Sequence, residues 1–245
     1  MKVVAFVPVK LNNQRTPGKN TRRFSDGDAL ITVFLKTLVK VQGIEEIYVF
    51  CSDPGIQEYL IPKVDYLQRP YFLDTQEATP QDIISEFMKL VHADIYAVCH
   101  CTSPFVTVAH IEECVEAIKS GRFDSSFTAE RIQKLIWSSD NKPMNFEPEN
   151  VPRTQDLEPI FCEVSAAYVF RREVFESLRR RIGINPHITE VTGVECIDID
   201  YPEDFEMANA IYGFVRGGTS VKRRKIKIKI PAPFLGENPS MGGAA

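Results

Sequence analysis

At 245 residues, with 44% hydrophobic and 25% charged side chains, the chain has the composition of a folded globular protein. Its formal net charge of −4 argues against a general nucleic-acid-binding protein, and no apolar run approaches the roughly 18 residues of a membrane span. The segment MKVVAFVPVK reads as a strand, so we expect no signal peptide. The six cysteines form no Cys-x-x-Cys pair and lie mostly in apolar runs, which favours reduced core thiols in a cytoplasmic protein.

Apolar runs alternate with helix-like segments along most of the chain. We expect strands at residues 3–9, 46–52, 65–69, 95–100, 124–129, 165–171 and 194–199. We expect helices at residues 29–41, 80–91, 108–120, 172–181 and 202–215. Thr79, Pro80 and Asp82 form a helix-start signal, and Gly121 marks a helix end. This alternation predicts an α/β fold with a mostly parallel sheet and helices on both faces.

Ligands of such sheets bind beyond the carboxyl ends of the strands. The loops after Val9, His100 and Ile199 should therefore share one cleft. The alternation is lost at residues 138–160, which contain four prolines and read as an excursion from the sheet. We expect one domain, residues 1–215, and a basic, flexible tail at 216–245. Within the tail, residues 222–230 alternate basic residues with isoleucine and could form an amphipathic edge strand or a disordered arm.

The first expected strand opens into a basic, turn-rich loop. Residues 10–20 hold the cations Lys10, Arg15 and Lys19 around the turn residues Pro17 and Gly18. Backbone N–H groups that curl around an anion, with long cations beside them, are how α/β proteins hold phosphate. The loop matches neither the Walker A pattern nor the dinucleotide pattern Gly-x-Gly-x-x-Gly. A phosphate site and a solvated basic turn therefore both remain open.

Other candidate side chains follow the later strands. Asp198 and Asp200 end an expected strand, whose alternation points both carboxylates to one side; they suit Mg²⁺ or cap the next helix. Thr102 and Ser103 could contact a base or ribose, or could start a helix. Arg69 could add a cation to the cleft or lie at the surface.

His100 lies between Cys99 and Cys101. A zinc site is not supported, because side chains 99 and 101 should face away from side chain 100 and no second ligand pair complements them. A Cys/His nucleophile is not supported either, because no Asp or Asn partner stands out.

Four segments in order give the chain a resemblance to a known family over residues 3–213. Residues 10–20 resemble Arg-x-x-Ser-x-x-x-Pro-x-Lys-Asn, residues 102–104 resemble the end of Gln-Pro-Thr-Ser-Pro, residues 153–157 resemble Arg-Arg-Gln-Asp-Leu, and residues 198–205 resemble Asp-Ile-Asp-x-x-x-Asp-Phe. These are marks of the cytidylyltransferases that activate sugar acids, the acylneuraminate (CMP-sialic acid) synthetases and the related CMP-Kdo synthetases. The chain resembles these enzymes.

The resemblance implies a Rossmann-like nucleotidyltransferase fold and transfer of CMP from CTP to an acidic acceptor, with release of pyrophosphate. The acceptor would be a nonulosonic or related sugar acid for a surface polysaccharide such as capsule or lipopolysaccharide. Residues 131–165 would form a dimerisation arm that reaches the site of the partner in a homodimer. The implied site residues are, for catalysis, Lys10, Arg15, Lys19 and Asp200; for the nucleotide, Leu11, Asn12, Asn13, Gln14, Asn20, Arg69, His100, Thr102 and Ser103; for the acceptor, Arg153, Gln155, Cys162 and Glu163; and for Mg²⁺, Asp198 and Asp200.

The chain departs from the family pattern at three places. Lys10 replaces the first arginine of the loop and lacks its planar fork, and His100 replaces a glutamine. Cys162-Glu163-Val164 stands where acylneuraminate enzymes have Arg-x-Asn near the sugar, so we expect N-acetylneuraminate to be a poor acceptor. The alternatives are a cytidylyltransferase for a phosphorylated non-sialic acceptor, or a catalytically inactive nucleotide-binding protein. A glycosyltransferase would need a mid-chain Asp-x-Asp, which is absent.

Overall fold

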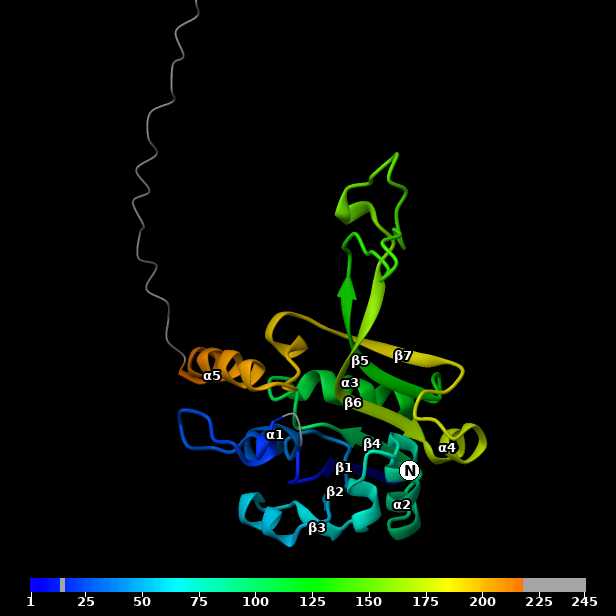
Figure 1. Cartoon of the computed structure of the whole chain (residues 1–245). Helices are drawn as coiled ribbons and strands as arrows, with labels where there is room; N and C mark the ends of the chain where they lie inside the picture. The colour runs from blue at the N-terminus through cyan, green and yellow to red at the C-terminus, as the bar shows by residue number, and fades with distance from the viewer. Residues whose placement is uncertain (14–15, 218–245) are drawn as a thin grey trace, which may run out of the picture.

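The computed structural model describes residues 1–13 and 16–217 and shows one seven-stranded sheet in the order β3-β2-β1-β4-β6-β5-β7 (Figure 1). The strands are β1 (Val3–Val9), β2 (Glu46–Cys51), β3 (Asp65–Gln68), β4 (Ile95–Cys99), β5 (Ser125–Ile132), β6 (Ile160–Arg171) and β7 (Pro186–Val191). In this part of the chain β6 alone runs against the other strands, because it pairs antiparallel with both β4 and β5. The expected mostly parallel sheet is confirmed.

Helices cover both faces of the sheet, as the alternating pattern predicted. They are α1 (Leu30–Leu38), α2 (Pro80–Leu90), α3 (Val108–Lys119), α4 (Arg172–Leu178) and α5 (Pro202–Gly217). Helices α1 and α3 pack against β1 side chains such as Val3, Ala5 and Val7. Helices α2 and α4 pack against the opposite β1 side chains, Val4 and Phe6. Short 3₁₀ helices connect these elements at Lys19–Thr21, Pro54–Tyr59, Tyr71–Asp74, Thr154–Asp156 and Gly193–Cys196.

Aromatic packing fixes β1, the strand that carries the basic loop. The Phe6 ring stacks on Phe87 of α2 with centroids 3.9 Å apart, and Phe50 of β2 meets both rings edge-on. All three side chains are fully buried. Burying one such side chain stabilises a fold by roughly 1.5–3 kcal/mol. The loop after β1 therefore extends from a rigid strand.

The predicted start of α2 is confirmed in detail. Thr79 Oγ1 accepts a hydrogen bond from the Asp82 N–H at 3.2 Å, and Asp82 Oδ2 accepts one from the Thr79 N–H at 3.0 Å. This is a capping box, with Pro80 at the first helical position. At the other end of an element, Gly121 follows α3 with φ +77°, as expected of a glycine that ends a helix.

One expected strand, at residues 194–199, is wrong. Residues 193–196 form a 3₁₀ helix and 197–200 are irregular, while the last strand of the sheet is β7, beside β5. The reason is tertiary: Ile199 is buried against α1 and α5 instead of in the sheet, and its N–H donates to the Thr102 carbonyl at 2.9 Å. The loop 197–200 still reaches the carboxyl end of the sheet, but strand alternation does not orient Asp198 and Asp200.

A second difference is the end of α4, expected at residue 181. The helix stops at Leu178 because Arg179 adopts a left-handed conformation with φ +56°. Arg181 therefore lies beyond the helix. The other expected elements are present with ends shifted by a few residues, except that β5 and β6 are longer than predicted and pair as far as Ile132 with Ile160.

The segment between β5 and β6 projects from the body of the molecule (Figure 1). The two strands leave the sheet together, and residues 133–159 form the end of the projection, with the 3₁₀ helix Thr154–Asp156 as their one helical turn in the structure described. Of the predicted tail at 216–245, residues 216–217 belong to α5, and residues 218–245 lie outside the described residues. Among those that are described, each helix is too short or too polar to span a lipid bilayer.

Candidate active site

Two adjoining cavities lie beyond the carboxyl ends of β1 and β4, with volumes of about 520 Å³ and 240 Å³. The larger one is lined by Lys10, Asn13, Thr16, Lys19, Thr75, Gln76, Ala78 and Asp200. The smaller one is lined by Pro8, Lys10, Asn13, Lys19, Asn20, Arg69, Leu73, Thr75, Ala78, Ile83, His100, Cys101 and Thr102. The loops after Val9, His100 and Ile199 thus share one cleft, as predicted. Leu11 instead packs on the apolar core, and Asn12 is exposed and lines neither cavity.

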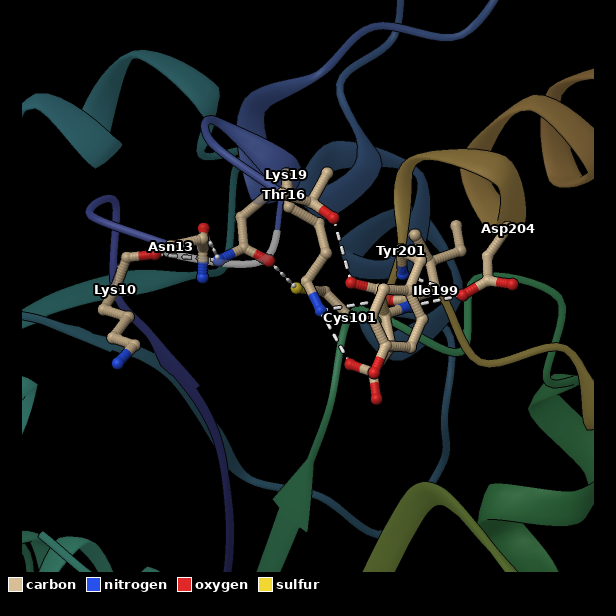
Figure 2. A network of polar contacts seen from close by, with 10 residues as sticks. Lys10, Asn13, Thr16, Lys19, Cys101, Ile199, Tyr201 and Asp204 are labelled. Carbon is tan, nitrogen blue, oxygen red and sulfur yellow. Dashed lines mark hydrogen bonds and ion pairs between the residues drawn. The ribbon is translucent and has the colours of Figure 1, made fainter. Parts of the chain in front are cut away.

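Lys19 is fixed on the wall of both cavities by the loop that precedes α5. Its Nζ donates a hydrogen bond to the Ile199 carbonyl at 2.7 Å and lies 3.1 Å from Asp200 Oδ1 (Figure 2). Thr16 Oγ1 donates to the Asp200 carbonyl at 2.9 Å. The turn that brings Lys19 here needs Gly18, whose φ of +68° favours glycine. Gln14 and Arg15 lie outside the described residues.

Asn20 joins the basic loop to the end of β4. Its Nδ2 donates to the Lys10 carbonyl at 2.9 Å and to Asn13 Oδ1 at 3.3 Å, and its Oδ1 accepts from Cys101 Sγ at 3.4 Å (Figure 2). Asn20 and Cys101 are both buried. The amide therefore holds Lys10 and Asn13 in one arrangement, so that both side chains line the cavities.

Arg69 is buried at the bottom of the smaller cavity. Its guanidinium pairs with Asp74, a residue that the sequence did not single out, and only 3% of its side chain is exposed. Ser52 Oγ donates to the other Asp74 oxygen at 2.5 Å, and Lys10 Nζ donates to the Asp74 carbonyl at 3.4 Å. The Arg69 Nε is buried without a hydrogen-bond partner in the described structure. Arg69 is thus a held cation rather than a surface arginine.

His100 is a neutral group in the wall of the smaller cavity. Burial, with the nearby charges of Arg181 and Lys19, lowers the pKa of His100 to about 4. Its Nε2 is buried and has no hydrogen-bond partner among the described residues. The uncharged His100 ring can therefore form a hydrogen bond with a ligand through Nε2.

Thr102 and Ser103 take different positions. Thr102 lines the smaller cavity, and its carbonyl binds the loop that carries the two acids. Ser103 is fully buried and lines neither cavity, and its Oγ has no hydrogen-bond partner in the described chain. The structure thus brings Thr102 into the site and places Ser103 behind it.

The acid pair is suited to a hard cation that also binds substrate oxygens. Asp204 caps α5, since its Oδ2 accepts from the backbone N–H groups of Asp200 and Tyr201 at 3.0 and 2.8 Å. Asp198 Oδ1 is buried with no hydrogen-bond partner in the described residues, and desolvation raises the pKa of the Asp198 carboxyl. Groups of three or more metal-ligating side chains do not occur in residues 1–13 and 16–217. Mg²⁺ commonly uses one or two carboxylates together with substrate phosphates, so the donor set fits it.

The residues expected at the acceptor do not line the two cavities. Arg153 is exposed on the projection and pairs with Asp156, with Nε 2.7 Å from Oδ2. Gln155 is exposed beside it. Cys162 is exposed on β6, so the expectation of a core thiol is wrong there, because that part of β6 belongs to the projection. Glu163 accepts a hydrogen bond from Tyr168 OH at 2.8 Å.

All six cysteines are free, as expected for reduced thiols. Cys51, Cys99, Cys101 and Cys114 are buried and Cys196 is partly buried. Tyr168 and Arg181 also stand near the cleft, although the sequence did not indicate them. Arg181 lies over the Tyr168 ring, and Tyr168 meets His100 edge-on. Arg181 was expected inside a helix, and no local signal pointed to its contact with Tyr168.

A mostly parallel sheet with a basic loop and an acid pair at its carboxyl edge defines a protein of the α/β nucleotidyltransferase fold. The solved structure of CMP:2-keto-3-deoxy-manno-octonic acid synthetase complexed with CTP has the same fold, with a TM-score of 0.66 and 19% identity over 88% of this chain and 100% of that one. The family model described as cytidylyltransferase matches residues 4–214. The chain belongs to the cytidylyltransferase family.

Two curated relatives match at the level of sequence. N-acylneuraminate cytidylyltransferase of Oncorhynchus mykiss is 30% identical over 218 residues, which cover 84% of this chain and 49% of the relative. CMP-N,N'-diacetyllegionaminic acid synthase of Legionella pneumophila is 27% identical over 229 residues, covering 86% of this chain and 96% of the relative. The chain spans about half the length of the Oncorhynchus mykiss protein.

Proposed function

We propose that this protein transfers CMP from CTP to an acidic acceptor, a nonulosonic or related sugar acid, and releases pyrophosphate. The observation that carries the proposal is the fixed cation Lys19 beside Asp200, on the wall of a cavity that Lys10 also lines. Family membership and the names of the two sequence relatives support CTP and a sugar acid as substrates. Such activated sugar acids would serve the synthesis of a surface polysaccharide.

The nucleotide would lie across the two cavities. Lys10 and Lys19 face the triphosphate, together with Arg15 by resemblance, while Arg69 and His100 contact the nucleoside from the smaller cavity. Asn13, Asn20 and Thr102 complete that wall. A hydroxyl oxygen of the acceptor attacks the α-phosphorus in line, the bond to the β-phosphate oxygen breaks, and pyrophosphate leaves, with the hydroxyl proton released to solvent. Because Lys19 is already held in place, its charge stabilises the transition state without reorganisation.

Mg²⁺ is the proposed cofactor, and Asp198 and Asp200 would hold it. When bound, the ion would neutralise phosphate charge as it develops on the leaving group. Asp200 also has a role that does not depend on the ion, because its carboxylate holds the Lys19 ammonium at the cavity wall.

The assembly is proposed to be a homodimer in which the projection reaches the partner. Exposed apolar side chains gather on it: Leu135, Trp137, Met144, Val151, Ile160 and Phe161. A surface of this kind is typical of a protein interface. Arg153 and Gln155 would then act at the partner's acceptor site, which would explain why they do not line the two cavities described above. Light scattering would test whether the protein is a dimer in solution.

The free cysteines favour a cytoplasmic compartment.

A screen of pyrophosphate release tests the function. Each of the four ribonucleoside triphosphates is incubated with Mg²⁺ and N-acetylneuraminate, Kdo, legionaminic acid, pseudaminic acid or glycerol 3-phosphate. We expect release with CTP and a sugar acid other than N-acetylneuraminate. Preference for glycerol 3-phosphate would favour the phosphorylated-acceptor alternative. No release with any pair, despite CTP binding, would indicate an inactive nucleotide-binding protein.

A further inference from the structure

We propose that Arg181 and Tyr168 form a subsite for the anionic group of the acceptor, on the far side of His100 from the nucleotide. The inference rests on the proposed function and gives its acceptor a specific partner. The ligand chemistry is an oxyanion, for which we favour the carboxylate of the sugar acid. The subsite belongs to this chain, whereas Arg153 and Gln155 lie on the projection.

The first observation is the position of the Arg181 guanidinium. It lies over the Tyr168 ring, with its central carbon 3.4 Å from the ring centroid. Stacking on an aromatic face fixes the plane of the guanidinium and leaves its N–H edge open for an in-plane partner. The Tyr168 OH is itself held by Glu163 at 2.8 Å. The platform under Arg181 is therefore rigid.

The second observation is that the Arg181 donors are not used. No residue in the described chain accepts a hydrogen bond from its guanidinium. The nearest anionic oxygen, Glu163 Oε2, is 3.8 Å from Arg181 NH2, which is too long for a hydrogen bond. A quarter of the side chain, 24%, is exposed. Glu163 is thus a loose ion-pair partner, and a largely buried guanidinium that donates no hydrogen bond can still bind a carboxylate through two parallel hydrogen bonds.

The third observation connects this cation with the cleft. The rings of Tyr168 and His100 meet edge to face with centroids 6.2 Å apart, and His100 lines the smaller cavity. The charge of Arg181 contributes to the lowered pKa of His100, so the cation lies close enough to act on a cavity residue. A ligand that contacts both His100 and Arg181 would thus be adjacent to the nucleotide.

The backbone explains how Arg181 reaches this place. Helix α4 ends at Leu178 because Arg179 is left-handed, and the chain then turns away from the helix axis. Arg181 can therefore lie over β6, where Tyr168 faces the same side of the sheet as α2 and α4. A helix continued to residue 181, as the sequence suggested, would place this side chain differently.

The test uses the full chain and Arg181→Gln, with Arg181→Lys as a second variant. The matched control is Arg122→Gln, since the exposed Arg122 guanidinium also lies over an aromatic ring, that of Phe123, but lines neither cavity. Turnover is measured with the best sugar acid from the panel and with its primary amide. We expect Arg181→Gln to lower kcat/KM for the acid about tenfold or more, to abolish the preference for acid over amide, and to leave the KM for CTP unchanged. Arg181→Lys should restore part of the preference, because lysine keeps the charge but not the fork.

Binding provides a readout that does not depend on turnover. Each acid, and glycerol 3-phosphate, is titrated by calorimetry into protein loaded with a non-hydrolysable CTP analogue. Weaker acid binding in Arg181→Gln together with unchanged binding in Arg122→Gln would support the subsite, even if no acid is turned over. Absence of turnover would contradict only the proposed function. An acid-to-amide ratio or acid affinity unchanged in Arg181→Gln, or no acid binding to the wild type, would overturn the inference. If glycerol 3-phosphate bound and no sugar acid did, the subsite would be one for a phosphate, which would contradict our assignment of a carboxylate.

Discussion

The Lys19 ammonium lies 3.1 Å from Asp200 Oδ1, although the two residues are 181 positions apart in the chain. Lys19 comes from the loop after β1 and Asp200 from the loop before α5, and the ammonium also donates to the Ile199 carbonyl. Only 11% of the Lys19 side chain is exposed, whereas 46% of the Asp200 side chain is. The contact therefore places a shielded cation and a more accessible carboxylate at one point of the cavity wall.

Lys19→Met should weaken CTP binding. The substitution removes the charge and keeps an apolar stem, so a charged contact to phosphate is lost at a cost of about 1.5–3 kcal/mol. We expect an increase in the Kd for CTP of about tenfold or more by calorimetry. Lys40→Met is the matched control because Lys40 is exposed and outside the cavities. Equal CTP affinity in wild type and Lys19→Met would show that Lys19 only ties the two loops together.

Asp200→Asn should remove turnover and leave the fold intact. Asparagine keeps the shape of the side chain but loses the charge that Mg²⁺ prefers and that holds Lys19. We expect pyrophosphate release to fall by about 100-fold or more, on the scale of losing a transition-state charge interaction, with a Tm close to that of the wild type. Asp140→Asn, at an exposed acid of the projection that pairs with Lys142, is the control. Near wild-type release by Asp200→Asn would refute its proposed role.

Asp74→Asn should destabilise the protein through Arg69. The Arg69 guanidinium is buried and would lose its charged partner, and a buried pair broken on one side costs about 3–5 kcal/mol. We expect a lower free energy of unfolding in urea and a higher KM for CTP. The double variant Arg69→Met/Asp74→Asn should recover much of the stability but not the KM. If the two single substitutions were instead additive in stability, the pair would not be coupled.

His100 should make stability depend on acid pH. Its pKa is about 4 in the folded protein against 6.5 for an ordinary histidine, so the unfolded chain binds the proton first as pH falls. Stability from the neutral ring is thus complete above about pH 6.5 and is lost between 6.5 and 4. We expect His100→Gln to lose less stability than the wild type between pH 7 and pH 4.5 in urea unfolding. Parallel losses in the two proteins would contradict a buried neutral His100.

The parts of the site that the sequence predicted are those with a local signature. The basic loop, the helix start at Thr79 and the alternation of strands with helices each depend on neighbouring residues. The structure contains the last two and, of the loop, residues 10–13 and 16–20. The strand at 194–199 was wrong because the alternating apolar side chains of Ile197 and Ile199 look the same whether they face a sheet or, as here, the helices α1 and α5.

The remaining features depend on tertiary contacts. Helix α4 ends at the left-handed Arg179, and because this residue is neither glycine nor asparagine, the sequence gives no signal of the helix end there. The pairings of Arg69 with Asp74 and of Arg181 with Tyr168 follow from how the chain turns at the sheet edge. Arginines such as Arg69 and Arg181 can be identified as candidate site residues only when their burial and their hydrogen-bond partners in the folded chain are known.

Phosphorus-31 NMR of a reaction that contains CTP, Mg²⁺ and the preferred acceptor tests the proposed chemistry most directly, because it shows which phosphorus is attacked. Attack on the α-phosphorus predicts equimolar pyrophosphate and a CMP–acceptor phosphodiester, with no CDP. CDP with a phosphorylated acceptor, or CMP and pyrophosphate with the acceptor unchanged, would contradict transfer of CMP.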